Sequence, residues 1–230
     1  MFEKQETSKM RNKVSFAPST LFYNHGRCPR YWKFAFDAEV VSGTQQIGVQ
    51  ELQVMDAGTK LHDFIQAKLL NDLDIEIEKE LKNEHPPIRG FADGVITLDD
   101  GSKIILEIKT TSSAAFEIRR NTHKVPGYHI GQVLIYMYIE NTDTSLLFYL
   151  NRDTFERVII PVYRKDYTTE LDELLTWLNS LETIIESGKT PVFFKGYRQN
   201  SRICKQCPFQ EHCAEVGQGT EEIDRLRVLE

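Results

Sequence analysis

The sequence lacks any long apolar run, although 40% of its 230 residues are hydrophobic. We therefore expect a globular chain with a substantial core and no membrane span. It also lacks a basic excess, because the formal net charge is -6, which argues against a generally basic nucleic-acid coat. A complete phosphate-binding loop is missing as well: Gly188-Lys189-Thr190 matches the end of one, but Thr183 replaces the required earlier glycine. These absences point away from a membrane protein and from a nucleotide-driven motor.

Cysteine is scarce, with four residues in two places. Cys204, Cys207 and Cys213 form a CxxCx5C motif, and Cys28 lies far away in HGRCPRYW. The first residues, MFEKQETSKMRNK, are charged throughout and do not form a signal peptide, so we expect a cytoplasmic protein without disulfides. Four thiolates can bind zinc or ligate a 4Fe-4S cluster, and ligand type does not distinguish the two. Four unrelated buried cysteines are the alternative.

Two strand-like runs, residues 91–98 and 103–109, flank the turn-forming sequence Asp99-Asp100-Gly101. A three-residue loop with Gly101 in the left-handed conformation would pair Leu98 with Ser102. A two-residue loop would shift the register by one residue. The sequence thus predicts a β-hairpin whose register depends on the type of turn.

The first of these registers brings three charged side chains together. It places Asp93 opposite Glu107, and strand alternation puts Lys109 on the same face and Ile108 on the other. Two carboxylates can hold Mg²⁺ or Mn²⁺, which polarises a phosphate and activates water, while a lysine offsets developing negative charge. The pattern therefore suggests metal-dependent phosphodiester cleavage. A solvated hairpin with one exposed salt bridge is the alternative.

Two predicted helices flank this hairpin in the sequence. Gly127 to Glu140 carries Gln132 and Tyr136 four residues apart, so they share a face. Met55 to Leu73 carries His62, with Gly58 one turn earlier, where a missing side chain permits close approach to a neighbour. Taken singly, a core tyrosine and a hydrogen-bonded helix histidine would explain these residues equally well.

The remaining chain predicts strands at 145–151 and 155–162 and a packing helix at 166–187 that ends at Gly188. A helix capped near Ser19 precedes Cys28. Two basic clusters, Arg27, Arg30 and Lys33 and the segment 119–124, are candidates for steering DNA. Solvated faces are the alternative for both. We expect residues 217–230 to form a C-terminal tail that is frayed or faces a partner.

The order of these motifs resembles that of RecB-like nucleases of the PD-(D/E)xK superfamily: Gly58 to His62, Gly90 to Asp93, Glu107 to Lys109, and Gln132 to Tyr136. Ala92 departs from the proline of the superfamily's name. The resemblance implies an α/β, restriction-endonuclease-like fold, a central mixed sheet flanked by helices, in a single domain over residues 1–216. It also implies site roles: metal ligands His62, Asp93, Glu107 and the carbonyl of Ile108, a catalytic Lys109, and Gln132 and Tyr136 orienting the lysine or touching DNA.

The one-plus-three cysteine arrangement looks like the iron-sulfur branch of these nucleases, which includes the CRISPR-adaptation exonucleases of the fourth Cas family and the AddB nuclease domain. By this resemblance Cys28, Cys204, Cys207 and Cys213 would ligate a 4Fe-4S cluster, rather than zinc, that joins the N- and C-terminal segments.

The implied function is a Mg²⁺- or Mn²⁺-dependent exonuclease acting on single-stranded or frayed DNA ends. Recombination, repair, phage DNA processing and CRISPR prespacer trimming all fit, with a helicase, a recombinase or a CRISPR-adaptation protein as partner. The alternatives are a non-catalytic DNA-end-binding subunit that retains the nuclease fold, and a flap or duplex endonuclease.

Overall fold

The computed structural model describes residues 12–43, 53, 55–61, 64–65 and 74–230, together with the backbone of 5–6 and 46–47. The chain divides into two compact units. The first comprises residues 1–48, 82–89 and 169–230, and the second comprises residues 49–81 and 90–168. The assignment of residues 1–216 to a single nuclease domain stays a prediction. Within the described ranges, no helix is both long and apolar enough to cross a membrane.

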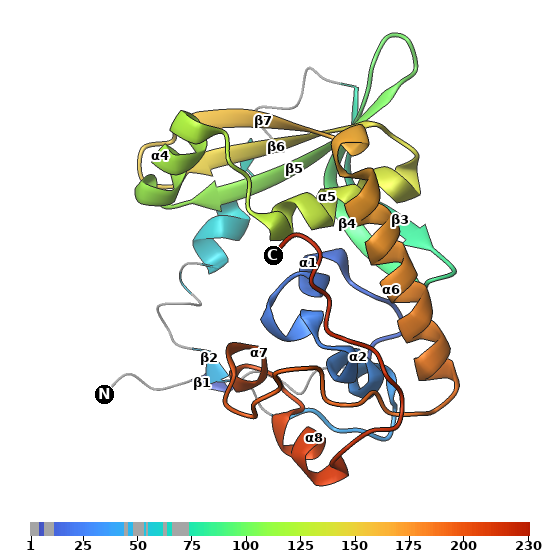
Figure 1. The fold of residues 1–230 in the computed structure, drawn as a ribbon. Helices are drawn as coiled ribbons and strands as arrows, with labels where there is room; N and C mark the ends of the chain where they lie inside the picture. The colour runs from blue at the N-terminus through green and yellow to red at the C-terminus, as the bar shows by residue number, and fades with distance from the viewer. Residues whose placement is uncertain are drawn as a thin grey trace. The chain divides into compact units, whose positions relative to one another are not determined.

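The second unit holds most of a five-stranded sheet with the order β3-β4-β5-β6-β7 (Figure 1). The strands are β3 (Ile75–Asn83), β4 (Ile88–Thr97), β5 (Lys103–Thr111), β6 (Thr144–Asn151) and β7 (Arg157–Tyr163). β4 and β5 are antiparallel, β5 and β6 parallel, and β6 and β7 antiparallel. The parallel pair requires a crossover, which α4 (Ser113–Thr122) and α5 (Gly127–Glu140) supply. The predicted α/β class with a mixed sheet flanked by helices is confirmed.

The hairpin has the three-residue turn that the sequence predicted. Gly101 adopts a left-handed φ of 81°, and the Leu98 amide donates to Ser102 O at 2.9 Å. The observed register pairs Gly94 with Leu106 and Thr97 with Lys103. Extended by one residue, this register sets Asp93 opposite Glu107. Turn chemistry alone therefore identified the pairing of the two carboxylates.

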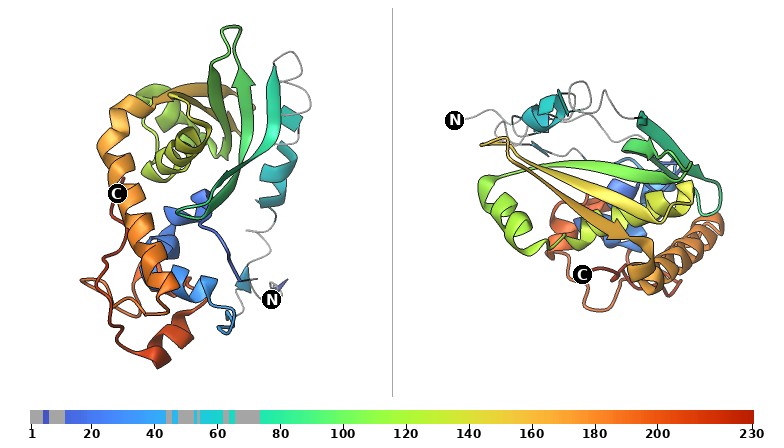
Figure 2. Two further views of the ribbon diagram at one scale, coloured as in Figure 1. Left: turned by 90° about the vertical axis from the view of Figure 1, so that its right-hand side faces the viewer. Right: turned by 90° about the horizontal axis from the view of Figure 1, so that it is seen from above.

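The two faces of the sheet differ in character. On one face, Leu106, Ile108, Phe148 and Leu150 form a hydrophobic core together with Ile65. On the other face α5 lies beside β5 and β6 (Figure 2). Residues 55–61 are helical, as predicted, but His62 and residues 66–73 of the predicted helix lie outside the described residues.

Gly58 lies close to β5, as its lack of a side chain suggested. A Cβ atom built at this position would come 3.4 Å from Thr110 Oγ1. The helical segment can therefore approach the strand that carries Glu107 and Lys109 closely.

The first unit is mainly helical. Its elements include α1 (Pro18–Leu21), η1 (Asn24–Arg27), α2 (Pro29–Phe36), α7 (Arg202–Lys205), α8 (Gln210–Val216) and the small sheet of β1 (Gln5–Glu6) and β2 (Gln46–Ile47). The helix α6 (Thr168–Glu186) follows η2 (Arg164–Tyr167), buries a stripe of leucines and ends before Gly188 at φ 72°. The predicted cap at Ser19 is wrong: Ala17 is the N-cap, because Pro18 favours the first helical position.

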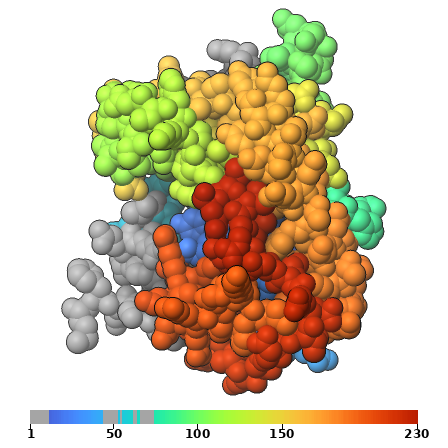
Figure 3. Space-filling view, viewed as in Figure 1, coloured from blue at the N-terminus to red at the C-terminus, as the bar shows by residue number. Residues whose placement is uncertain are grey.

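The tail at 217–230 is part of the first unit and packs within it, so the expectation of a frayed end is wrong, and a partner-facing role stays a prediction. Leu226 and Val228 are buried. The Leu226 amide donates to Arg27 O, and Arg27 Nη1 donates to the carbonyls of Leu226 and Val228. The outer side of this segment, in dark red, is visible at the surface in Figure 3.

The first basic cluster is not a DNA-steering surface. Arg27, Arg30 and Lys33 are only 9%, 1% and 8% exposed. Lys33 pairs with Asp37 at 3.2 Å, and the two arginines donate to backbone carbonyls. The sequence misled because charged residues at successive helix positions are usually solvated, whereas here they hold chain segments together.

Candidate active site

A hydrogen-bonded network surrounds Glu107, which is only 2% exposed. Its Oε1 accepts hydrogen bonds from Lys109 Nζ at 2.6 Å and from Gln132 Nε2 at 2.8 Å. Lys109 Nζ also donates to Gln132 Oε1 at 3.1 Å. Strand alternation on β5 puts Glu107 and Lys109 on one face of the sheet, and α5 adds Gln132 from above that face. The amide of Gln132 thus holds both members of a partly buried ion pair in place.

Asp93 lies on β4 next to Gly94, which pairs with Leu106 of β5. Its Oδ2 accepts the amide N–H of Ile108 at 2.6 Å. Burial raises the pKa of Asp93 to about 6, while the Ile108 amide and Lys109 lower it and Glu78 raises it further. The carboxyl of Asp93 therefore lies in a poorly solvated site next to β5, where a cation would stabilise its ionised form.

Tyr136 completes the network one turn further along α5. Its hydroxyl accepts a hydrogen bond from Gln132 Nε2 at 3.3 Å, and the residue is 2% exposed. Burial, followed by the charge of Glu107, raises the pKa of the phenol well above its usual range, so it is neutral. The structure therefore brings Glu107, Lys109, Gln132 and Tyr136 together and places Asp93 beside Ile108. His62 lies outside the described residues.

Sequence reasoning missed a second cluster on the same face of the sheet. Tyr149 of β6 pairs with Lys109 in the parallel register, and its hydroxyl lies 2.7 Å from His129 Nδ1. The Arg119 guanidinium lies 6.0 Å from the centroid of the Tyr149 ring. Burial, then Lys109 and Arg119, lower the pKa of His129 to about 3. The three-residue spacing of His129 and Gln132, which places them on one helix face, could have revealed it.

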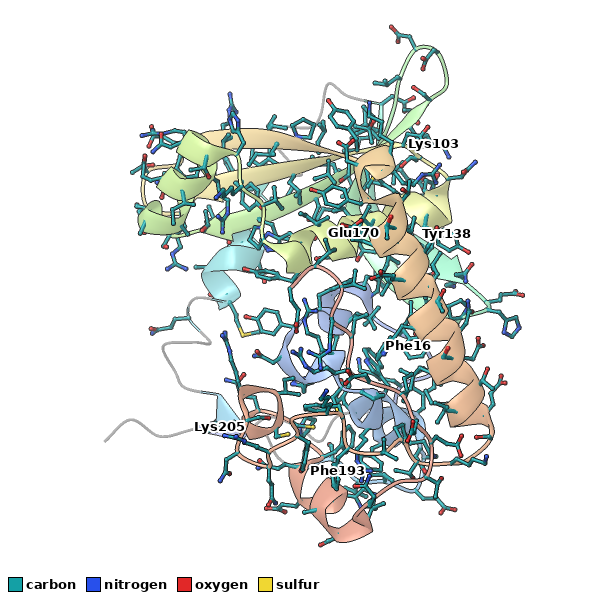
Figure 4. All side chains as sticks on the ribbon, viewed as in Figure 1. Phe16, Lys103, Tyr138, Glu170, Phe193 and Lys205 are labelled. Atoms are coloured by element: carbon teal, nitrogen blue, oxygen red, sulfur yellow. The ribbon has the colours of Figure 1, made fainter. Side chains whose placement is uncertain are left out.

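The four cysteines lie together in the first unit. Cys28, Cys204, Cys207 and Cys213 all line one cavity with an empty volume of about 330 Å³, including the part open to solvent. None forms a disulfide. Burial raises the pKa of Cys28 and of Cys207 to about 12. Figure 4 shows sulfur atoms gathered between the labelled residues Lys205 and Phe193. The proximity of Cys28 to the CxxCx5C motif was predicted, and the identity of any bound group stays a prediction.

No three His, Cys, Asp or Glu side chains in the described part of the chain are placed to hold a metal ion as they stand. At the network on β5 the described carboxylates are Asp93 and Glu107, and the third expected side chain, His62, is outside the described residues. The donor chemistry nevertheless suits a hard divalent cation, because carboxylate oxygens are the ligands that Mg²⁺ and Mn²⁺ prefer. The residues present therefore fit such a metal.

Comparison with known proteins identifies the family of the chain and a similar fold. The family model of the PD-(D/E)XK nuclease superfamily matches residues 23–214. No relative was found among curated proteins. The crystal structure of SSO0001 is similar with a TM-score of 0.50 and 18% identity, covering 89% of this chain and 88% of that one.

Two exonuclease structures are more distant. An alkaline exonuclease from Laribacter hongkongensis has a TM-score of 0.47 and 17% identity, covering 58% of this chain and 71% of that one. A phage-related exonuclease from Haemophilus somnus 129PT has a TM-score of 0.36 and 12% identity, covering 59% of this chain and 70% of that one. The family match shows the superfamily, and the similarity to SSO0001 concerns the fold alone.

Proposed function

The chain belongs to the PD-(D/E)XK nuclease superfamily, and from this premise we propose that it is a metal-dependent deoxyribonuclease with Asp93, Glu107 and Lys109 at its reaction centre. One observation carries the proposal. The partly buried Glu107–Lys109 pair, at 2.6 Å, is held by Gln132 beside Asp93. An exposed hairpin salt bridge would need neither burial nor the third side chain.

We assign the ligand role to Asp93, Glu107, the carbonyl of Ile108 and His62. Bound there, Mg²⁺ or Mn²⁺ would polarise the scissile phosphate and lower the pKa of the attacking water. Lys109, positioned by Gln132, offsets the negative charge that develops on the phosphate. Tyr136, a neutral phenol, anchors the amide of Gln132 and thereby the direction of the lysine.

We propose single-stranded or frayed DNA ends as substrate and exonucleolytic cleavage as the reaction. The support is the order of the four motifs, which resembles RecB-like nucleases. Recombination, repair, phage DNA processing and CRISPR prespacer trimming remain the candidate settings, each with its own helicase, recombinase or adaptation partner. A flap or duplex endonuclease is the second candidate for the reaction. A non-catalytic end-binding subunit is the alternative, and the connected network of Glu107, Lys109 and Gln132 argues against it.

We further propose that the four cysteines ligate a 4Fe-4S cluster, as in the iron-sulfur branch of these nucleases. The cavity that all four line supports a shared group, and zinc is the alternative. Anaerobically purified protein should be brown and contain iron and inorganic sulfide, whereas a zinc protein would be colourless. Cys28→Ser should abolish the colour and destabilise the fold. A fully stable, metal-loaded Cys28→Ser variant would refute the four-cysteine centre.

One experiment tests the reaction. Protein purified without oxygen is incubated with end-labelled single-stranded and duplex DNA in Mg²⁺, in Mn²⁺ or with chelator. We expect metal-dependent shortening from one end of the single strand. Internal cuts would favour the endonuclease, and tight binding of ends without cleavage in either metal would favour the non-catalytic subunit.

A further inference from the structure

Among the described residues of the first unit, Arg30 is the most deeply buried charged side chain, with 1% of its surface exposed. Its guanidinium donates to three backbone carbonyls: Pro191 at 2.6 Å, Gly217 at 2.8 Å and Cys213 at 3.2 Å. A fourth donor, Nε, lies 3.1 Å from the sulfur of Cys213. No carboxylate among the described residues forms an ion pair with it. The hydrogen-bonding capacity of the group is thus well used, but its charge is not neutralised.

A buried cation without an anion is costly. Removing an ion from water costs several kcal/mol, and neutral carbonyls recover only part of that. Aromatic rings help, since the guanidinium lies 4.3 Å from the Phe193 ring centroid and 5.5 Å from that of Phe34. Ring quadrupoles attract a desolvated cation but carry no net charge, so they do not neutralise it. The surroundings of Arg30 therefore call for a negative charge.

Arg27, in the same segment, is a buried arginine with a carboxylate nearby. It is 9% exposed and also donates to carbonyls, those of Phe22, Leu226 and Val228. Burial lowers the pKa of Arg27, but the nearby Glu230 carboxylate opposes that effect. Arg30 has no such carboxylate, and the atoms facing its Nε belong to the wall of the four-cysteine cavity.

We propose that Arg30 is the counter-cation of an anionic tetrathiolate centre in this cavity, and that it positions Cys213 by donating from Nε to the ligating sulfur. This inference rests on the proposed cysteine-ligated centre. Four thiolates around Zn²⁺ or around a 4Fe-4S core carry a net negative charge, which would neutralise the guanidinium. A hydrogen bond to a ligating sulfur also raises the reduction potential of an iron-sulfur cluster, because it stabilises the more negative, reduced state.

The test compares Arg30→Met and Arg30→Lys with Arg27→Met, the matched control. Each full-length variant is reconstituted anaerobically with iron and sulfide. The reduction potential is measured by redox titration followed by electron paramagnetic resonance, and the rate of cluster loss is measured in excess chelator. For Arg30→Met we expect at least a tenfold shift of the one-electron equilibrium toward the oxidised form, about 59 mV, and about tenfold faster loss. Arg30→Lys should shift less, in the same direction, while Arg27→Met should keep the parental potential.

The outcomes separate the two proposals. A parent protein that retains neither iron nor zinc refutes the four-cysteine centre, and Arg30 then loses its anion as well. A loaded parent whose Arg30→Met variant keeps the parental potential and rate of loss refutes only the role of Arg30. If the parent selects zinc, the rate of zinc release to chelator replaces the potential, with the same ordering of variants. If Arg30→Met does not fold, Arg30→Lys decides, and a parental potential in that variant overturns the proposal.

Discussion

Replacing Lys109 by methionine should separate what this residue does for stability from what it does for cleavage. Glu107 has a side chain only 3% exposed, and Lys109 one 23% exposed. Breaking a buried ion pair by removing one partner costs about 3–5 kcal/mol, because the other charge stays buried. Since Lys109 is partly solvated, we expect a loss of about 3 kcal/mol in the free energy of unfolding at neutral pH. Cleavage should fall about 100-fold or more.

The double variant Glu107→Gln/Lys109→Met distinguishes the two effects. It removes the orphaned charge but keeps the shape of the side chain, so most of the lost stability should return. Cleavage should not return, because both the carboxylate and the ammonium are then missing. Urea unfolding measures the first quantity, and digestion of end-labelled single-stranded DNA in Mg²⁺ measures the second.

Lys103→Met is the matched control on the same strand. Lys103 pairs with Glu140 at 2.6 Å, but its side chain is 41% exposed, so the change should cost at most about 1 kcal/mol. Its cleavage rate should equal that of the parent. Near-parental cleavage by Lys109→Met would refute the assignment of the reaction centre. A double variant as unstable as the single one would refute the buried-charge argument.

Three further predictions concern groups around this network. Asp93→Asn should lose cleavage yet unfold at a higher urea concentration than the parent at pH 8. Burial raises the pKa of Asp93 to about 6, so its ionised form destabilises the fold as pH rises from 4 to 6. An unchanged unfolding midpoint at pH 8 would contradict this. His129, whose pKa is lowered to about 3, contributes stability that is present above pH 6.5 and lost as pH falls. Between pH 7 and pH 5, the parent should lose about 2 kcal/mol more unfolding free energy than His129→Gln, measured by urea unfolding. An equal loss in both proteins would show that His129 is not its source. Finally, affinity for single-stranded DNA should fall as the salt concentration rises. Arg119→Gln should flatten the slope of log affinity against log salt concentration by about 0.7, whereas Arg120→Gln should change it less, because Arg120 is ion-paired with Glu117. An affinity of the parent that does not depend on salt would argue against phosphate contacts.

Local sequence signals predicted the hairpin and the helix next to it. Asp99-Asp100-Gly101 specified a turn with a glycine at positive φ, and that turn determined the register of Asp93 and Glu107. The predicted helix at 127–140 matches α5. The four-residue spacing of Gln132 and Tyr136 translated directly into a contact. β3 was missed, although its alternating Ile75, Ile77 and Glu residues carried the signal of a strand.

Burial was the property that the sequence could not supply for charged residues. Arg30 and Arg119 are both basic residues on helices, yet Arg30 is enclosed by carbonyls and aromatic rings, whereas Arg119 lies over the ring of Tyr149. Which side of a short helix is covered depends on segments more than a hundred residues away. The tail at 217–230 illustrates the same point, since nothing in its composition indicates that Leu226 is held by Arg27.

The sequence by itself determined the residues of the candidate site and their local order, because turn type, strand alternation and helix spacing depend only on near neighbours. Tertiary structure decided what surrounds them. The parallel pairing of β5 with β6 set Tyr149 beside Lys109, and the packing of α5 on that face turned Gln132 toward Glu107. In the first unit, the resemblance had implied that Cys28 lies near the distant cysteines, but only the fold enclosed Arg30 beside Cys213. Such contacts between distant segments depend on how hydrophobic faces are buried together, a property of the whole fold that no local pattern contains.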